Sequence, residues 1–220
     1  MWRRYTSVIM GATAVALLGA AFLWAETEVA AKPELTKLPE PALVGKMSVE
    51  EAISKRRSIR SLSEEALTME QVSQLVWAAQ GITQKERGLR TAPSARAIYP
   101  LTVYAVMKDA AYKYVPAEHA LEKVKDGDLR SQLARQRTVT SAPLTLVIAA
   151  DYAKMGGGSA HTWTDFEAGC VGENVFLQGV AMGLGSVPVG GMDPAKVAEV
   201  LGCPANETVV ILIPLGKPAA

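Results

Sequence analysis

Apolar residues follow two different periods along residues 47 to 220, and each period predicts one kind of element. Three stretches, 100–107, 142–151 and 207–216, are apolar over most of their length, as buried strands are. The segment AYKYVP at 111–116 alternates polar and apolar positions like one arm of a hairpin. These four stretches predict a central sheet.

Helices are predicted where apolar residues recur at spacings of three and four. The segment TMEQVSQLVWAAQG begins with Thr68, has a glutamine three positions later, and places its apolar side chains on one face. Shorter helices are expected from about residue 49 and after Asp193, and residues 116–136 are expected to form two helices separated by a break. Helices and strands that mix without strict alternation predict an α+β fold with a central sheet.

The N-terminal region differs from the rest of the chain. Two arginines precede an uncharged apolar run in residues 1–25, a pattern typical of a cleaved export signal or a retained membrane anchor. Residues 26–46 are Pro-rich and aperiodic, which predicts a linker. Residues 47–220 then form one domain, and we expect it to work outside the cytoplasm, either in the periplasm or anchored to the membrane and facing outward.

The composition limits the classes of function. The 220 residues carry a formal net charge of only +1, which argues against a nucleic-acid partner and requires any anion site to be local. Two cysteines and two histidines are too few for a disulfide scaffold or a histidine-rich metal site, so we expect no metal. Cys170 is expected to be a buried structural residue, and His119 is expected to face solvent.

Four cations lie within six residues in the segment KRRSIR. Arg56, Arg57 and Arg60 surround Ser58, and no acidic residue lies within the segment. Arginine binds phosphate through paired, charge-assisted hydrogen bonds, and a serine hydroxyl adds a short donor. The segment therefore predicts a phosphate site. The alternative is that these cations only complement the dipole at the end of the preceding helix.

Two further segments are rich in small residues. In TAPSARAIYP, residues 91–100, small side chains between two prolines would let the backbone approach a ligand closely, although an ordinary loop has the same pattern. In GLGSVPVGGMD, residues 183–193, glycines would leave backbone N–H groups open to a flat ligand, and the alternative is a helix stop followed by a turn. Neither segment has the spacing of a phosphate-binding or dinucleotide-binding glycine loop.

The helix predicted before the second segment carries several glycines. Gly169, Gly172, Gly179 and Gly183 fall within an arc of about 80° on a helix of 100° per residue. Glycine costs up to about 1 kcal/mol relative to alanine in a helix, so something must press closely on this face. A two-fold related helix, a cofactor, or a tightly packed core of the same chain would each explain the pattern.

Five segments occur together in one family. They are RRSIR, APSARAIYPLTVYAV, AYKYVPAEHALEKVKDGDLR, FEAGCVGENVFLQGVAMGLGSVPVGG and ILIPLGKP. Residues 47–218, which contain them, resemble the FMN-dependent nitroreductase superfamily, most of all its thiazole- and oxazole-forming dehydrogenases. The resemblance implies a nitroreductase-like α+β fold with a mixed or antiparallel central sheet surrounded by helices. It also implies a homodimer with FMN at its interface and the long glycine-faced helix at the centre.

The resemblance also assigns cofactor-binding roles, with no catalytic side chain because the chemistry belongs to the flavin. The phosphate and ribityl chain would be held by Arg56, Arg57, Ser58 and Arg60. The flavin would be lined, from the second subunit, by Pro93, Ser94, Ala95 and Arg96. Its reactive edge would lie near Pro188, Val189, Gly190 and Gly191. Lys217 is the candidate for the basic residue that many relatives have after the last strand. Arg96 stands where the usual pattern has glycine.

The resemblance implies an FMN-dependent oxidoreductase that transfers a hydride or electrons between a donor and a small organic acceptor. Because no nicotinamide pool is expected outside the cytoplasm, we expect a membrane quinol, a redox protein or the organic substrate as donor. One alternative is a dehydrogenase that oxidises a peptide or small molecule, as azoline oxidases do, although their Lys-Tyr pair is not identifiable. The other is a non-catalytic flavin-binding protein.

Overall fold

The computed structural model describes residues 34–156 and 160–219. The predicted signal or anchor, residues 1–25, and the first part of the predicted linker lie outside the described residues. Within the described ranges, no helix combines the length and the apolar character needed to cross a membrane.

The centre of the fold is a seven-stranded sheet with the order β1-β6-β5-β4-β7-β9-β8, in which each neighbouring pair is antiparallel. Its strands are β1 (Leu35–Lys37), β4 (Leu101–Val106), β5 (Ala110–Val115), β6 (Ala120–Asp126), β7 (Leu144–Ala150), β8 (Gly185–Ser186) and β9 (Thr208–Gly216). A separate hairpin pairs β2 (Ile82–Gln84) with β3 (Leu89–Arg90). The four predicted strands are confirmed as β4, β5, β7 and β9.

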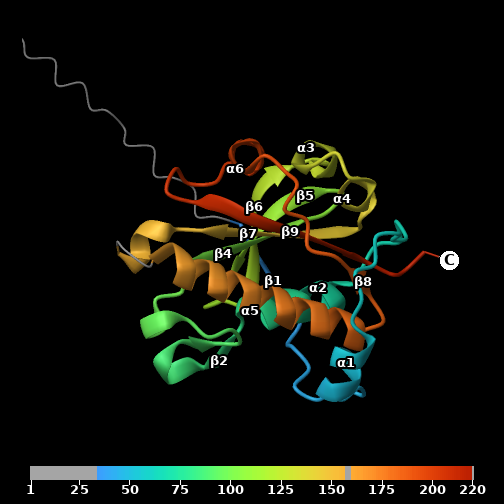
Figure 1. The fold of residues 1–220 in the computed structure, drawn as a ribbon, viewed down its shortest axis with the longest axis horizontal. Coiled ribbons are helices and arrows are strands. Elements are labelled where there is room, and N and C mark those ends of the chain that lie inside the picture. The colour runs from blue at the N-terminus through green and yellow to red at the C-terminus, as the bar shows by residue number, and fades with distance from the viewer. Residues whose placement is uncertain (1–33, 157–159, 220) are drawn as a thin grey trace, which may run out of the picture. The chain divides into compact units, whose positions relative to one another are not determined.

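Helices cover both faces of the sheet (Figure 1). They are α1 (Val49–Lys55), α2 (Met69–Gln80), α3 (Arg130–Leu133), α4 (Arg137–Ser141), α5 (Ala160–Ala181) and α6 (Pro194–Leu201), with short 3-10 turns η1 (Lys85–Arg87), η2 (Ala95–Ala97) and η3 (Tyr152–Met155). Helices α2 and α5 lie on one side, and α3, α4 and α6 on the other (Figure 1). The predicted capping box is present, because Thr68 and Gln71 bond each other's backbone N–H groups.

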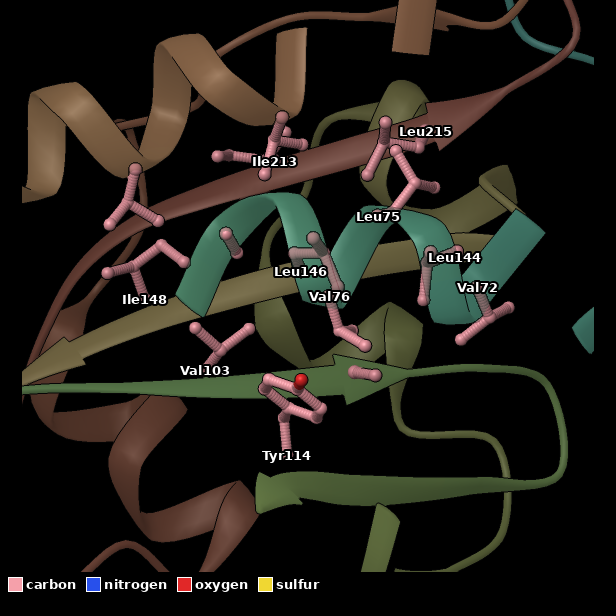
Figure 2. Close-up of a cluster of buried hydrophobic side chains, with 14 of the residues drawn as sticks. Val72, Leu75, Val76, Val103, Tyr114, Leu144, Leu146, Ile148, Ile213 and Leu215 are labelled. Atoms are coloured by element: carbon pink, nitrogen blue, oxygen red, sulfur yellow. The ribbon is translucent and has the colours of Figure 1, made fainter. Parts of the chain in front are cut away.

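The larger apolar core lies between α2, α5 and one face of the sheet. Figure 2 shows Val72, Leu75 and Val76 of α2 directed toward the strands, where Leu146 and Ile148 of β7 lie. All seven residues of β7 are buried, as expected for a central strand. Val171 and Val175 of α5 belong to the same cluster. Each buried aliphatic side chain contributes about 1.5–3 kcal/mol, so this core holds both α2 and α5 against the sheet.

The prediction of a helix at the start of residues 116–136 is wrong. Residues Ala120–Asp126 form strand β6, which pairs with β5 on one side and β1 on the other. The segment is rich in residues that favour helices, but Glu122 and Val124 are half-buried while Lys123 and Lys125 are exposed, which is the alternation of a strand covered on one face. Pairing with two neighbouring strands therefore outweighs local helix propensity.

The prediction that His119 faces solvent is also wrong. His119 lies in the tight β5–β6 turn with a left-handed φ of 43°. Its Nδ1 atom lies 2.9 Å from the Tyr114 hydroxyl, and its Nε2 atom lies 2.8 Å from Ser73 Oγ and 2.9 Å from the carbonyl oxygen of Pro39. The ring therefore joins the turn, α2 and the chain before α1.

The described part of the predicted linker is packed against the domain. Residues 35–37 form β1, and the Leu38 N–H donates to the carbonyl of His119 over 3.0 Å. The Ala42 N–H donates to the side-chain oxygen of Gln74 over 2.8 Å. The expectation of a free tether is thus corrected for this stretch, because short β pairing and the Gln74 amide hold it in place.

The glycines of α5 do not form one open face. Gly172 and Gly179 are buried, and a methyl group on them would lie 3.9 Å from Ile213 and 3.5 Å from Leu215 of β9. Gly169 is open, and Gly183 lies after the helix with a φ of 72°. Gly172 and Gly179 thus face the sheet of their own chain, where a methyl group would make only ordinary van der Waals contacts.

Candidate functional site

The segment Arg56–Arg60 runs along one edge of the sheet. Helix α1 ends at Lys55, and the chain then pairs with β8, where the Ile59 N–H donates to the Ser186 carbonyl over 2.9 Å. Further along, Leu62 pairs with Pro218 beyond β9. These backbone contacts place the predicted phosphate segment beside the segment that leads to Gly190.

The side chains of this segment differ in how they are used. Arg57 donates to the carbonyls of Ser54 (3.1 Å) and Arg56 (2.7 Å), so the helix-end alternative holds for Arg57. Among the described residues, no hydrogen bond or ion pair involves the guanidinium groups of Arg56 and Arg60 or the Ser58 hydroxyl. Two uncompensated cations and one hydroxyl therefore remain for an anion.

The Pro188–Gly191 turn lies on the same edge. Val189 and Leu212 exchange backbone hydrogen bonds of 2.8 and 3.1 Å, which hold the start of the turn against β9. The N–H groups of Gly190 and Gly191 donate to no acceptor within the described ranges, as the predicted cofactor contact requires. A methyl group on Gly191 would meet Gln136 Nε2 at 2.9 Å, so this turn also packs closely on the α3–α4 segment.

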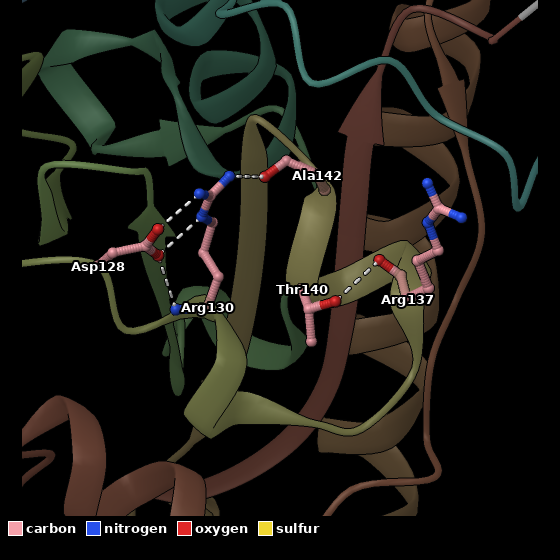
Figure 3. Close-up of polar contacts among 5 residues, drawn as sticks. All are labelled: Asp128, Arg130, Arg137, Thr140 and Ala142. Carbon is pink, nitrogen blue, oxygen red and sulfur yellow. Dashed lines mark hydrogen bonds and ion pairs between the residues drawn. The ribbon is translucent and has the colours of Figure 1, made fainter.

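The α3–α4 segment completes this edge, and its contribution was not predicted. Gln136 Nε2 donates to the Gly191 carbonyl over 2.7 Å, and Thr138 Oγ1 donates to the Arg60 carbonyl over 2.8 Å. Arg137 lies between them with an exposed side chain (Figure 3). The cluster ARQR at residues 134–137 was the available signal, but it lies at the end of a stretch that was predicted to form two helices, and no binding role was assigned to it.

A buried arginine holds the α3–α4 segment in place. Arg130 Nε and Nη2 donate to the two carboxylate oxygens of Asp128 over 2.8 and 2.6 Å, and Nη1 donates to the Ala142 carbonyl over 3.0 Å (Figure 3). The Arg130 guanidinium lowers the pKa of Asp128. We define the cationic edge as residues 56–60, 136–138 and 188–191, and Arg130 supports it from the interior.

Lys217 is not a free cation. Its Nζ atom forms an ion pair of 2.6 Å with Glu65, and its carbonyl accepts the Ser63 N–H over 2.8 Å. Lys217 is therefore near the cationic edge through the backbone, but its charge is already balanced. Its assignment to the cofactor stays a prediction from the resemblance.

Residues 93–96 lie elsewhere. Arg96 Nη2 donates to the Met155 carbonyl over 2.9 Å, and Asn174 of α5 donates to the Thr91 carbonyl over 3.3 Å. Ser94 of this loop lies beside Glu167 of α5, whereas β8 follows the C-terminal end of α5 at Ala181 (Figure 1). At 1.5 Å per residue, about 21 Å of helix lies between Glu167 and that end. One chain therefore does not bring residues 93–96 to the cationic edge.

The loop has an unusual backbone. Arg96, Ala97 and Tyr99 have φ values of 57°, 55° and 52°, a region that costs side-chain-bearing residues about 1–3 kcal/mol. The Tyr99 N–H donates to Ser94 Oγ over 2.8 Å, and the Tyr99 hydroxyl accepts the Arg90 N–H over 3.0 Å. We call residues 94–99 the strained loop. These bonds hold it in its left-handed conformation.

A cluster of polar side chains, Gln80, Arg90 and Glu167, packs against the strained loop on its interior side. Arg90 Nη1 donates to Gln80 Oε1 over 2.9 Å, and its guanidinium lies 4.5 Å from the centre of the Tyr99 ring. Glu167 of α5 is only 2% exposed, and its Oε2 atom has no partner. Burial raises the pKa of Glu167, although hydrogen bonds from Ser94 and Gln80 and the charge of Arg90 oppose the rise. Sequence reasoning missed this cluster because nothing in the pattern links positions 80, 90 and 167.

An open groove runs beside α5. It has a volume of about 760 Å³ and lies between the chain before α1, helix α2 and a face of α5 that includes Asn174, Leu177 and Ala181. Toward the N-terminus of α5, Trp163 is 51% exposed and Phe166 is 63% exposed. Cys170, which was expected to be buried, is partly exposed on the same helix, and neither cysteine forms a disulfide.

Comparison with known proteins agrees with this architecture. The model of the Nitroreductase family matches residues 53–217, so the chain belongs to the nitroreductase family. A Methanocaldococcus jannaschii protein that bears the name nitroreductase is 33% identical over 187 residues, which cover 79% of this chain and 93% of that protein. The fold predicted from the sequence is thereby confirmed, and family members are oxidoreductases.

Solved structures show the same fold. A crystal structure from Ralstonia eutropha, described as a nitroreductase, has a TM-score of 0.79 and 32% identity, covering 84% of this chain and 90% of that one. The NADPH:FMN oxidoreductase from Vibrio harveyi, complexed with NAD+, has a TM-score of 0.60 and 25% identity, covering 78% and 69%. The narrower likeness to thiazole- and oxazole-forming dehydrogenases stays a prediction.

Proposed function

We propose that this chain is an FMN-dependent oxidoreductase in which two copies hold each cofactor between them. The cationic edge of one copy would take the phosphate and ribityl chain, and the strained loop of the other would line the flavin ring. The Vibrio harveyi relative, whose name includes FMN as its partner, supports the choice of cofactor. FMN, when bound, would accept a hydride on its ring and pass the electrons to a small organic acceptor.

The observation that carries the proposal is the set of unpaired groups at the cationic edge. Arg56, Arg60 and Arg137 have exposed or half-exposed side chains, and no acidic side chain forms an ion pair with them in the described part of the chain. A phosphomonoester carries close to two negative charges at neutral pH and offers three acceptor oxygens. The residues present therefore fit an FMN phosphate, with Ser58 as a neutral donor.

The Pro188–Gly191 turn fits the other end of such a cofactor. A methyl group on Gly190 would meet nothing within 4 Å, so the backbone here faces open space. The free N–H groups of Gly190 and Gly191 would donate to ring heteroatoms whose electron density rises on reduction. Hydrogen bonds of this kind favour the charged state of a bound group, which is how a protein tunes a flavin.

The requirement for two copies follows from the position of the strained loop. Within one chain, α5 separates residues 93–96 from the cationic edge, so a single copy offers an incomplete site. The groove beside α5 and the exposed side chains Leu43, Val44 and Val49 that line it provide apolar surface for a second copy. Burial of such surface is favourable by about 25 cal/mol per Å², which supports a stable homodimer.

The location and the electron donor are separate proposals. We propose export because of the basic start and apolar run in residues 1–25, and we propose a membrane quinol or a redox protein as donor. A fusion to a reporter enzyme that is active only outside the cytoplasm should be active. Efficient steady turnover with NADPH, together with an inactive reporter, would contradict both proposals.

The direct test of the proposed function is identification of the bound small molecule. The protein from residue 34 onward, which includes β1, should be purified, denatured, and the released molecule analysed by absorbance and mass. We expect FMN in about one copy per chain. A colourless folded protein that does not take up added FMN would refute the proposal. Redox cycling of the bound flavin by any donor and acceptor then separates an enzyme from a flavin store.

A further inference from the structure

Arg96 combines a costly backbone conformation with a fixed side chain. Its φ of 57° lies in the region where glycine is favoured, and Ala97 beside it has a φ of 55°. Strain of this kind persists only where the surrounding structure enforces it, and it gathers at functional sites. A glycine at position 96 would remove this cost, so the strain makes Arg96 a candidate for a functional side chain.

The Arg96 guanidinium is oriented but not neutralised. Nη2 donates to the Met155 carbonyl over 2.9 Å, which fixes the group without balancing its charge. No acidic side chain of the described residues pairs with Arg96, and its side chain is exposed. The Nε and Nη1 atoms retain their hydrogen-bonding capacity, which suits a planar carboxylate.

The acidic groups of the neighbouring elements have other partners. Asp151, before η3, accepts the Ala153 N–H over 3.1 Å and lies 3.9 Å from Lys154 Nζ. Asp165, in the first turns of α5, accepts the Tyr152 hydroxyl over 2.6 Å. The positive charge of Arg96 is therefore available to a ligand. It does not belong to a local ion-pair network.

We propose that Arg96 is a specificity-determining residue that binds the carboxylate of a small organic substrate at the mouth of the flavin site. The inference rests on the proposed function, which places the strained loop beside the flavin ring. In that arrangement the phosphate of the cofactor is already matched by the cationic edge of the other copy. Arg96 is the one charged residue among Pro93–Ala97, so it sets the charge preference of this part of the site.

The test compares two aromatic ligands of the same shape, benzoate and benzamide, on the FMN-loaded protein. Isothermal titration gives the Kd of each ligand for the parent and for Arg96→Gly, Arg96→Lys and Ala97→Gly. We expect the parent to bind benzoate at least about tenfold more tightly than benzamide, which is the size of one charge-assisted hydrogen bond. This preference should disappear in Arg96→Gly, persist in part in Arg96→Lys, and shrink at high salt.

The controls separate charge from backbone effects. Ala97→Gly relieves the same left-handed strain without removing a charge, so it should retain the parent's preference for benzoate. The melting temperature of Arg96→Gly should equal or exceed that of the parent, because glycine tolerates this φ. A folded Arg96→Gly protein therefore keeps the comparison valid.

The outcomes distinguish failure of this inference from failure of the proposed function. If the parent contains FMN but binds both ligands equally, or if Arg96→Gly keeps the preference for benzoate, the carboxylate role of Arg96 is refuted while the flavin assignment stands. If the parent neither contains nor takes up FMN, the proposed function fails first and the inference fails with it. The inference is supported if Arg96→Gly loses the preference for benzoate while Ala97→Gly keeps it.

Discussion

The cationic edge and the strained loop are built in opposite ways. The cationic edge exposes Arg56, Arg60 and Arg137 without acidic partners, and its backbone is held by ordinary strand pairing and two side-chain bonds. The strained loop has left-handed backbone at Arg96 and nearby positions and rests on buried polar groups. The cationic edge carries positive charges that no acidic side chain balances, whereas the strained loop has a backbone conformation that its hydrogen bonds hold fixed.

This difference separates binding from positioning. A group that binds an anion gains most when its charge is unpaired in the free protein, because no internal ion pair must be broken. A group that positions a ligand gains most when its own conformation is fixed beforehand. We therefore expect substitutions at the cationic edge to change cofactor affinity, and substitutions below the strained loop to change stability and pH dependence.

The largest effect is expected from removing charge at the cationic edge. Arg56→Ala with Arg60→Ala should weaken FMN binding by about 10²–10⁴-fold, because each lost hydrogen bond to a charged group is worth about 1.5–3 kcal/mol. Titration of flavin-free protein with FMN, followed by fluorescence, measures the change. Lys125→Ala removes an exposed cation from β6 and should leave the Kd within twofold. A similar loss in both variants would mean that net charge alone attracts the cofactor.

The second effect concerns the packing that aligns the cationic edge. A methyl group at Gly185 would lie 2.8 Å from Ile59 Cβ and 3.1 Å from a methyl carbon of Leu62. Gly185→Ala should therefore lower the free energy of unfolding by about 1–3 kcal/mol, as overpacking does. Gly190→Ala is the matched control because its methyl group would meet nothing within 4 Å. Urea unfolding of both variants checks this, and equal stability would show that the segment can move away freely.

A smaller effect is expected from the bonds that join α4 to the cationic edge. Thr138→Val keeps the side-chain shape but removes the bond to the Arg60 carbonyl, and this should cost about 1 kcal/mol in stability. FMN affinity should fall only a few-fold, since no group that contacts the cofactor is lost. Thr140→Val, on the same short helix, removes a longer bond of 3.3 Å and should cost less. The reverse order would contradict a link between α4 and Arg60.

The smallest expected effect is a change in the pH dependence of stability. Burial raises the pKa of Glu167 above its usual value of 4.5, so the folded protein binds a proton that the unfolded chain releases. Stability should then fall as the pH rises from about 4.5 through the raised pKa of the folded state. Glu167→Gln should flatten this slope, and Glu173→Gln, an exposed position on the same helix, should not. Parallel pH curves for parent and Glu167→Gln would show that Glu167 does not titrate in this way.

Most of the fold was predictable because burial follows local pattern. The apolar runs of β7 and β9 and the one-sided pattern of α2 each match the element that the structure contains. Strand β6 was missed because its helix-favouring residues are held in a sheet by two neighbours that are distant in sequence. Local preference is weak compared with such pairing.

The candidate site was predictable only where its residues are consecutive. The cations around Ser58 and the turn at Gly190 could be read directly from the sequence, and the structure places both on one edge. Arg137 reaches that edge only through tertiary contacts of its neighbours. The same is true of Glu167, whose partners come from α2 and β3. A sequence pattern does not show which distant segments come into contact in the fold.

The most direct test of the central claim is native mass spectrometry of the purified protein, with bound FMN counted on each species. The claim is that one chain holds only part of the site and that two copies complete it. We predict dimers that carry two FMN molecules, and flavin-free monomers when the dimer is dissociated by dilution. Monomers that retain FMN would contradict the account, because the cationic edge of one chain would then suffice.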